Sequence, residues 1–259
     1  RICLRLWAPH LVRVNEKWLC YVTMPYGRKW NAEYPAGSGQ FGGNLLYGFV
    51  LSANELSGKW KLETVLFCGD KEQGDEYHKL KWNSIDISTI WYDGSLYMLY
   101  GTNGVNIVKL ANDGLSIQGT SILLTEEANN CEAGYMFWRA GYFYLMTSIG
   151  GAGRNEHYAI SITRSTSPFS GFVDQNGTYI LNDARNIKKM FQEYGNIFSV
   201  GHNSRIVRDK EGREFCMYAG YTETGKRKLF LQEIEWDKST GYPHFKGVLP
   251  QEKCLIPNI

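Results

Sequence analysis

The chain has few features that would indicate a membrane protein, a nucleic-acid-binding protein or a zinc protein. Its 259 residues contain no apolar run of the ~18 to 20 residues that a membrane-spanning helix needs. Lysine and arginine total 28 against 26 aspartates and glutamates, which gives a net charge of +2. This balance leaves no basic surface of the kind that nucleic acids require. We therefore expect neither a membrane span nor a nucleic-acid partner.

The six cysteines show no CxxC pair and no other zinc-ligand spacing. Cys20 and Cys216 lie inside apolar segments, where a thiol usually packs as a small hydrophobic group. We expect free thiols, although disulfides stay open as an alternative. The compartment is therefore only weakly determined by the cysteines.

Helix signals are scarce as well. The best candidate is a short segment with helical spacing over residues 183–191. Elsewhere, short apolar or alternating runs are separated by glycine, asparagine or aspartate, which predicts strands joined by turns. Aromatic residues make up 14% of the chain and favour strands. An all-β domain of this length is ordinary, and we expect a single domain over residues 1–259.

Four polar motifs recur along the chain, each a short distance upstream of an aromatic-rich segment. They are WAPH at residues 7–10, NSID at 83–86, NCEAG at 130–134 and GHNS at 201–204. A turn signal such as Asp93-Gly94 precedes each aromatic segment. A unit with its own hairpins that repeats every ~45 to 75 residues is typical of radial β architecture. The sequence therefore predicts an all-β fold, a β-propeller with about four blades in this chain.

Two of these motifs contribute a carboxylic acid, Asp86 and Glu132. In a propeller, the innermost strand of each blade opens onto the central channel, so residues at the strand entrances would converge. Two carboxyl groups in one cleft are the minimum for hydrolysis of a glycosidic bond, because one protonates the leaving oxygen and the other activates water or tunes its neighbour. The spacing leaves open the alternative that both acids only cap strand ends.

The sequences of the four motifs resemble those of glycoside hydrolase family 43. The likeness runs in order through the second, third, fourth and fifth blades of that family, at residues 7–21, 84–94, 131–145 and 201–204. Residues 164–177 are similar to the arabinanases of the family. The resemblance implies a five-bladed β-propeller and an inverting hydrolase that acts on arabinan or on arabinose- or xylose-containing hemicellulose.

The resemblance also implies a role for each matched residue. Glu132 would be the general acid, and Asp86 would orient it and raise its pKa. His202 would lie at the propeller centre and help to hold one calcium or similar ion; the alternative is a buried histidine bonded to the backbone. Substrate contacts are expected from Trp7, His10, Trp138, Ser148 and His202.

The sequence departs from the family at the catalytic base. The family carries this base as an aspartate upstream of WAP, whereas no acidic residue precedes Glu16 here. Three explanations stay open: a first blade outside this chain or on a companion chain, a non-catalytic module that binds carbohydrate or protein, or a substitute base such as Glu33 or Asp75. We favour the first, because a four-bladed remainder would leave strand edges unpaired. The family further implies a polysaccharide partner and a secreted or periplasmic location, with an intracellular one left open.

Overall fold

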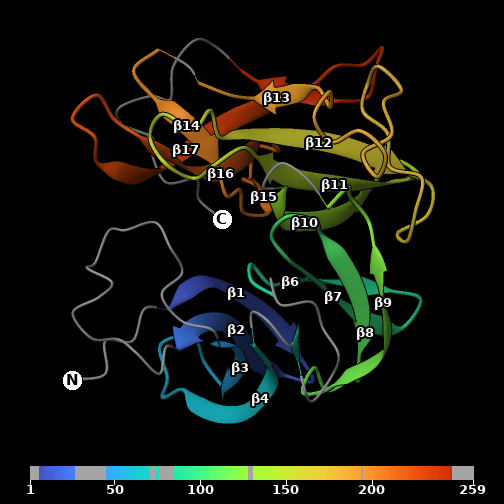
Figure 1. The fold of residues 1–259 in the computed structure, drawn as a ribbon, viewed down its shortest axis with the longest axis vertical. Helices are drawn as coiled ribbons and strands as arrows, with labels where there is room; N and C mark the ends of the chain where they lie inside the picture. Colours follow the sequence, from blue (N-terminus) through green and yellow to red (C-terminus); the bar gives the residue numbers. More distant parts are fainter. Residues whose placement is uncertain are drawn as a thin grey trace. The chain divides into compact units, whose positions relative to one another are not determined.

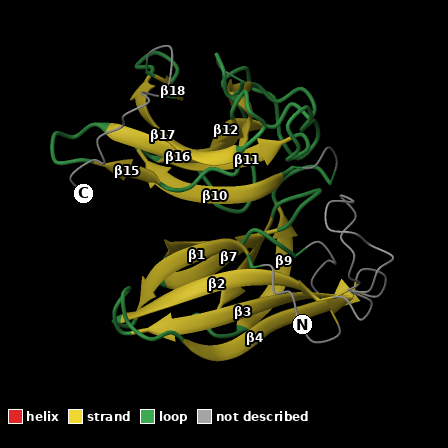
Figure 2. Cartoon of the chain, turned by 90° about the vertical axis from the view of Figure 1, so that its left-hand side faces the viewer, coloured by secondary structure: helices red, strands yellow, loops and turns green. Residues whose placement is uncertain are grey.

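The computed structural model of the chain describes residues 6–26, 45–70, 74–75, 84–127, 131–193 and 195–246. All regular structure in these residues is β-strand (Figure 1). Figure 2 shows the same residues as strands and loops only. None of them belongs to a helix that is long and apolar enough to cross a bilayer.

The strands form four sheets that follow one another along the chain. The first contains β1 (Trp7–Val14), β2 (Lys17–Tyr26), β3 (Leu45–Ala53), β4 (Lys61–Asp70) and β5 (Gly74–Asp75). The second contains β6 (Ser88–Tyr92), β7 (Ser95–Tyr100), β8 (Asn106–Leu110) and β9 (Ile117–Leu123). The third contains β10 (Glu132–Arg139), β11 (Tyr142–Ile149), β12 (Ala159–Ser165) and β13 (Lys189–Phe191). The fourth contains β14 (Phe198–Gly201), β15 (Ile206–Arg208), β16 (Glu214–Tyr221), β17 (Arg227–Trp236) and β18 (Pro243–Phe245).

These sheets confirm the all-β prediction and the four propeller blades predicted for this chain. Three of the predicted turns join the first strand of a sheet to the second, at residues 15–16, 93–94 and 140–141. Both residues of each turn have positive φ, which matches the right-handed twist of the flanking strands in a tight hairpin. Local turn chemistry in the sequence therefore determines where the first hairpin turns in three of the four sheets.

The predicted helical segment at residues 183–191 is wrong. Its last three residues form β13, which pairs with β12, and residues 184–187 form turns and bends. Side chains bind the backbone donors here: Ala184 N donates to Glu126 Oε2 at 2.9 Å, and Lys188 N donates to Asp174 Oδ2 at 2.8 Å. Such bonds offer the backbone an alternative to a helix, which the apolar spacing could not reveal.

The chain divides into two compact units, and each is described by itself. Unit 1 comprises Arg1–Thr102 and Asn106–Ile122 and holds the first two sheets; unit 2 comprises Asn103–Val105 and Leu123–Ile259 and holds the last two. The single domain over residues 1–259 stays a prediction. Within each unit the two sheets share one buried apolar core. In unit 1 the core includes Tyr21, Val50, Phe67, Leu96 and Met98. In unit 2 it includes Tyr144, Met146, Ile160, Cys216 and Tyr218.

Candidate active site

The first strand of every sheet begins with the same backbone geometry. One residue near each strand start has a positive φ although it is not glycine. These residues are Ala8 (42°), Asp86 (55°), Ala133 (53°) and Ser199 (50°). In each sheet the residue two positions later is paired with the neighbouring strand, which is β2, β7, β11 or β16. In the first, third and fourth sheets the register shifts here, as in a β-bulge. Bulges re-aim side chains, and left-handed backbone costs about 1 to 3 kcal/mol where it persists, so the strand starts are the candidate site.

Superposing the strand starts by their backbone geometry aligns different residues than aligning the four motifs by residue type does. Asp86 occupies the left-handed position itself, whereas Glu132 directly precedes that position at Ala133. The two carboxylic acids are therefore offset by one residue along their strands. In the last sheet the equivalent residue is Ser199, and His202 follows it with a positive φ of its own, 51°.

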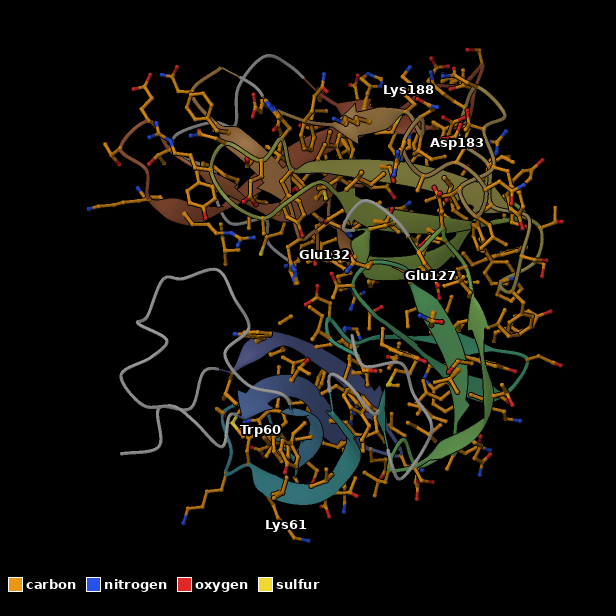
Figure 3. The ribbon with its side chains drawn as sticks, in the orientation of Figure 1. Trp60, Lys61, Glu127, Glu132, Asp183 and Lys188 are labelled. Atoms are coloured by element: carbon orange, nitrogen blue, oxygen red, sulfur yellow. The ribbon has the colours of Figure 1, made fainter. Side chains whose placement is uncertain are left out.

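Glu132 opens β10 in unit 2, where Figure 3 labels it. The hydroxyl of Tyr158 donates a hydrogen bond to Glu132 Oε1 at 2.6 Å. Tyr158 directly precedes β12, and its side chain is only 1% exposed. No sequence motif indicated Tyr158; the one signal nearby is the glycine-rich segment 150–153 upstream of it, because glycine allows a backbone to be approached closely.

Ser148 and His202 lie close to this carboxyl group. Ser148 is the cross-strand partner of Glu132 in β11, and its Oγ accepts a hydrogen bond from the backbone N of His202 at 2.8 Å. Ser148 is 0% exposed, so this bond makes it a residue that joins the third sheet to the fourth. Its contact with substrate stays a prediction. The structure thus brings three of the predicted residues together in unit 2.

The surroundings of His202 shift its pKa in opposite directions. Burial lowers the pKa of His202 below its usual range, the nearby Glu132 carboxylate acts in the opposite direction, and Arg227 adds to the lowering. An imidazole with a lowered pKa is neutral at neutral pH. His202 is therefore an uncharged ring within electrostatic reach of Glu132.

Asp86, His10 and Trp7 lie in unit 1. His10 Nε2 in β1 lies 2.9 Å from Thr89 Oγ1 and accepts a hydrogen bond from Thr89 N at 3.2 Å, which ties β1 to β6. Asp86 is 8% exposed and lies just before β6, and Trp7 is half-buried opposite Thr23. Asp86 thus lies just before β6, the strand to which His10 ties β1. The convergence of Asp86 with Glu132 and His202 stays a prediction, since these acids belong to different units.

Trp138 lies at the opposite end of β10 from Glu132. The two are six residues apart in the strand, or roughly 20 Å at the usual rise of a strand. The indole is 56% exposed and packs edge-on against Phe143, with ring centroids 4.6 Å apart. The structure does not bring Trp138 beside Glu132, and its substrate contact stays a prediction.

The remaining candidates are only partly described. Glu33, one suggested substitute base, lies outside the described residues, and of Asp75 only the backbone in β5 is described. Free thiols are confirmed for Cys20, Cys131 and Cys216. Burial raises the pKa of Cys131, next to Glu132, to about 11. This thiol is therefore protonated at neutral pH and unreactive.

Among the described residues, His202 is not joined by the cluster of side chains that would bind calcium directly. Calcium takes six to eight oxygen ligands, whereas His202 offers a ring nitrogen. Across the described ranges, no group of three histidine, cysteine, aspartate or glutamate side chains could hold a metal ion. The predicted ion at the propeller centre therefore stays a prediction, and no chemical step is assigned to it.

The chain matches one protein family along most of its length. The model of the family described as Glycosyl hydrolases family 43 matches residues 2–241. The probable arabinan endo-1,5-alpha-L-arabinosidase C of Aspergillus clavatus is 32% identical over 158 residues, which are 55% of this chain and 48% of that protein. The chain spans about half the length of such curated relatives.

Two solved structures are similar to it over nearly the whole chain. An exo-1,5-alpha-L-arabinanase from a bovine ruminal metagenomic library has a TM-score of 0.76 at 21% identity, covering 95% of this chain and 80% of that one. The Cellvibrio cellulosa alpha-L-arabinanase complexed with arabinohexaose has a TM-score of 0.74 at 17% identity, covering 93% and 77%. At these identities the likeness shows that the chain shares their fold.

Proposed function

Because the chain belongs to glycosyl hydrolase family 43, we propose that it is the catalytic propeller of an inverting glycosidase that cleaves arabinan. The substrate is inferred from the names of the relatives, which are arabinanases in both comparisons. The observation that carries the proposal is Glu132, a half-buried carboxyl at a bulged strand start, bound by Tyr158 and close to His202. A polymeric substrate also fits a secreted or periplasmic location.

The proposed chemistry needs one acid and one base. Glu132 protonates the glycosidic oxygen of the leaving sugar while the base removes a proton from the attacking water. The water oxygen bonds to the anomeric carbon as the glycosidic bond breaks, and the configuration of that carbon inverts. We assign to Asp86 the role that the family resemblance implies, to orient Glu132 and favour its protonated form, which requires the two carboxyl groups to be close because a nearby negative charge disfavours ionisation. An inverting enzyme holds its acid and base ~6.5 to 9.5 Å apart, which leaves room for the water.

We place the base on a fifth blade outside these 259 residues, and unit 1 supports this. Leu11, Cys20, Leu51 and Leu62 form one cross-strand row over β1 to β4. The row lies on the face opposite the shared core, because side chains alternate along a strand. Leu11 is 47% exposed, Leu62 53% and Val65 of β4 44%. A face of this kind is suited to pack against a further sheet.

Unit 2 has a corresponding face on its last sheet. Met217 pairs with Leu231 and Ala219 with Leu229 across β16 and β17. Met217 is 37% exposed and Leu229 73%, whereas Cys216 on the other face lies in the core. The chain also covers only 80% and 77% of the two arabinanase structures. A fifth blade would account for both the apolar faces and the length.

The proposal is tested with the full-length protein and its Glu132→Gln variant. The amide keeps the size of the side chain but donates no proton from an acidic group, so arabinan hydrolysis should fall by about 10²- to 10⁴-fold. Glu235→Gln, at a half-exposed position of β17, is the matched control and should keep full activity.

Three outcomes separate the alternatives. Loss of hydrolysis with unchanged arabinan binding supports Glu132 as the acid. Equal activity of Glu132→Gln and wild type excludes that role. Binding without cleavage by the full-length wild type identifies a sugar-binding module.

The 259 residues alone should bind arabinan without cleaving it, and robust cleavage by them would refute a base on a fifth blade.

A further inference from the structure

We infer that Tyr158 is a positioning residue that determines which carboxyl oxygen of Glu132 carries the catalytic proton. The inference rests on the proposed function and deepens it. Neither the motif wording nor the predicted site included this tyrosine, which is 26 residues from Glu132 in the sequence.

The hydrogen bond has a definite direction. A phenol at neutral pH is a donor, and Tyr158 donates to Glu132 Oε1 at 2.6 Å. An oxygen that already accepts this bond is a poor place for the proton, since two hydrogens would point at each other. The proton is thereby directed to Oε2, the oxygen that then donates to the glycosidic oxygen.

The ring of Tyr158 is held by the last sheet. A Cβ added to Gly201 at the end of β14 would overlap the Cδ1 and Cε1 atoms of the ring. Gly201 is therefore glycine because the ring packs directly on its backbone, and not because of its φ angle. The guanidinium of Arg227 in β17 lies 6.0 Å from the ring centroid. The glycine of the GHNS motif thus has a structural task that its sequence did not reveal.

The loop that leads into Tyr158 is bound to the same sheet. Ser199 Oγ donates to the carbonyl oxygens of Gly153 at 2.7 Å and Arg154 at 2.8 Å. The hydroxyl of Tyr221 donates to Ala152 O at 3.2 Å. Ser199 is the residue of the last sheet with the recurring left-handed backbone. The same backbone geometry thus serves two purposes. In the third sheet it lies next to Glu132, and in the fourth sheet it holds the loop that leads to Tyr158, the hydrogen-bond donor of Glu132.

The bond to Tyr158 has a consequence for pH dependence. A donated hydrogen bond favours the ionised carboxylate over the protonated acid. Cys131 and His202 each interact electrostatically with Glu132, Glu126 acts on Cys131, and Arg227 acts on His202. Removing only the hydroxyl of Tyr158 should leave these groups in place. Glu132 would then keep its proton to higher pH, and the alkaline limb of the activity profile would move up.

The test compares Tyr158→Phe with Tyr144→Phe in the full-length protein. Tyr144 is a matched control because it is 2% exposed, lies in the third sheet and also has a hydrogen-bonded hydroxyl, which donates to Gly241 O at 2.7 Å and accepts from Arg164 Nη1 at 3.5 Å. Each variant is assayed on arabinan and on a 4-nitrophenyl arabino-oligoside, whose leaving group needs no proton. We expect kcat on arabinan to fall about 10- to 100-fold for Tyr158→Phe. The nitrophenyl substrate should be little affected, and Tyr144→Phe should leave both the rates and the pH limb unchanged.

The outcomes distinguish this inference from the proposed function. Equal loss on both substrates, or an alkaline limb that does not move, makes Tyr158 merely structural and overturns the inference. A wild type that cleaves neither substrate refutes the proposed function, and the inference with it. If Tyr158→Phe does not fold, Gly201→Ala displaces the same ring with its hydroxyl kept. The same substrate-selective loss is then expected, and its absence overturns the inference.

Discussion

The two units join their sheets by different means. In unit 1 the first two sheets share an apolar core, supplemented by the bonds from His10 to Thr89 and from Tyr21 to Gly114 O. In unit 2 a similar core is accompanied by a charged cluster, in which Glu214 of β16 binds Arg139 of β10. Both units thus pack two blades around an apolar core, to which unit 2 adds these charged groups. They tie the strand of the proposed acid to the neighbouring blade.

The Glu214 cluster is compact. Glu214 Oε1 accepts hydrogen bonds from Arg139 and Arg208, both at 2.7 Å, and Oε2 accepts one from Trp236 Nε1 at 2.5 Å. The guanidinium of Arg139 also lies 4.0 Å from the centroid of the Trp236 ring. Burial would raise the pKa of Glu214, but the bonds from Arg208, Arg139 and Trp236 outweigh it and hold the pKa below its usual range. The carboxylate is thus ionised because its partners are in place.

The largest difference between the units should come from two glycine substitutions. An added Cβ would overlap an aromatic ring at both sites, Phe67 for Gly48→Ala in unit 1 and Tyr158 for Gly201→Ala in unit 2. Both variants should lose about 1 to 3 kcal/mol of stability, as overpacked cores do. Only Gly201→Ala should lower arabinan hydrolysis, by about 100-fold, since it displaces the tyrosine that binds Glu132. Denaturant unfolding and kcat measured together decide this, and equal activity of the two variants would contradict it.

The charged cluster predicts the next effect. Glu214→Gln should lower the free energy of unfolding by about 2 kcal/mol, less than the about 3 to 5 kcal/mol of a fully buried pair, because Arg208 and Arg139 keep part of their hydration. Their side chains are 61% and 31% exposed, against 11% for Glu214. Urea unfolding of both proteins measures the difference. A change within error would show that the charged cluster contributes little to the stability of unit 2.

The same variant should show a smaller effect of pH. The pKa of Glu214 lies below its ordinary 4.5 in the folded chain, so its stabilisation is present above about pH 4.5 and is lost as the pH falls through the lowered value. The stability difference between wild type and Glu214→Gln should therefore shrink in acid. Unfolding at about pH 6 and about pH 3.5 tests this. A difference that is constant with pH would mean that the carboxylate charge contributes little.

The smallest effect is expected in unit 1. Tyr21→Phe removes the hydrogen bond from the buried hydroxyl to Gly114 O, 2.9 Å long. The free energy of unfolding should fall by about 1 kcal/mol, which is the usual net contribution of such a hydrogen bond when its carbonyl partner is left unpaired. Thermal unfolding gives the value, and arabinan hydrolysis should not change. A loss as large as that of Glu214→Gln would remove the contrast between the units.

The motifs and the hairpins could be predicted from the sequence because they depend on neighbouring residues. Residues 93–94 and 140–141 adopt positive φ as their turn requires, and Glu132 opens a strand as its motif indicates. Trp138 is six residues beyond Glu132 in the same strand, so the rise of an extended strand places it at the far end of β10. The helix expected at residues 183–191 failed because its backbone donors bind Glu126 and Asp174, which are distant in the sequence.

By itself the amino-acid sequence determined the all-β class, the four blades and the identity of the acidic residues at two strand starts. It could do so because alternation, turn residues and motif wording are local properties of the chain. Only the tertiary structure decided that Ser199, and not His202, corresponds to Asp86, since Ser199 and Asp86 both have a positive φ two residues before a residue paired with the neighbouring strand. The tertiary structure likewise decided that Tyr158 binds Glu132, because the pairing of β11 with β10 and β12 brings together residues that the sequence separates.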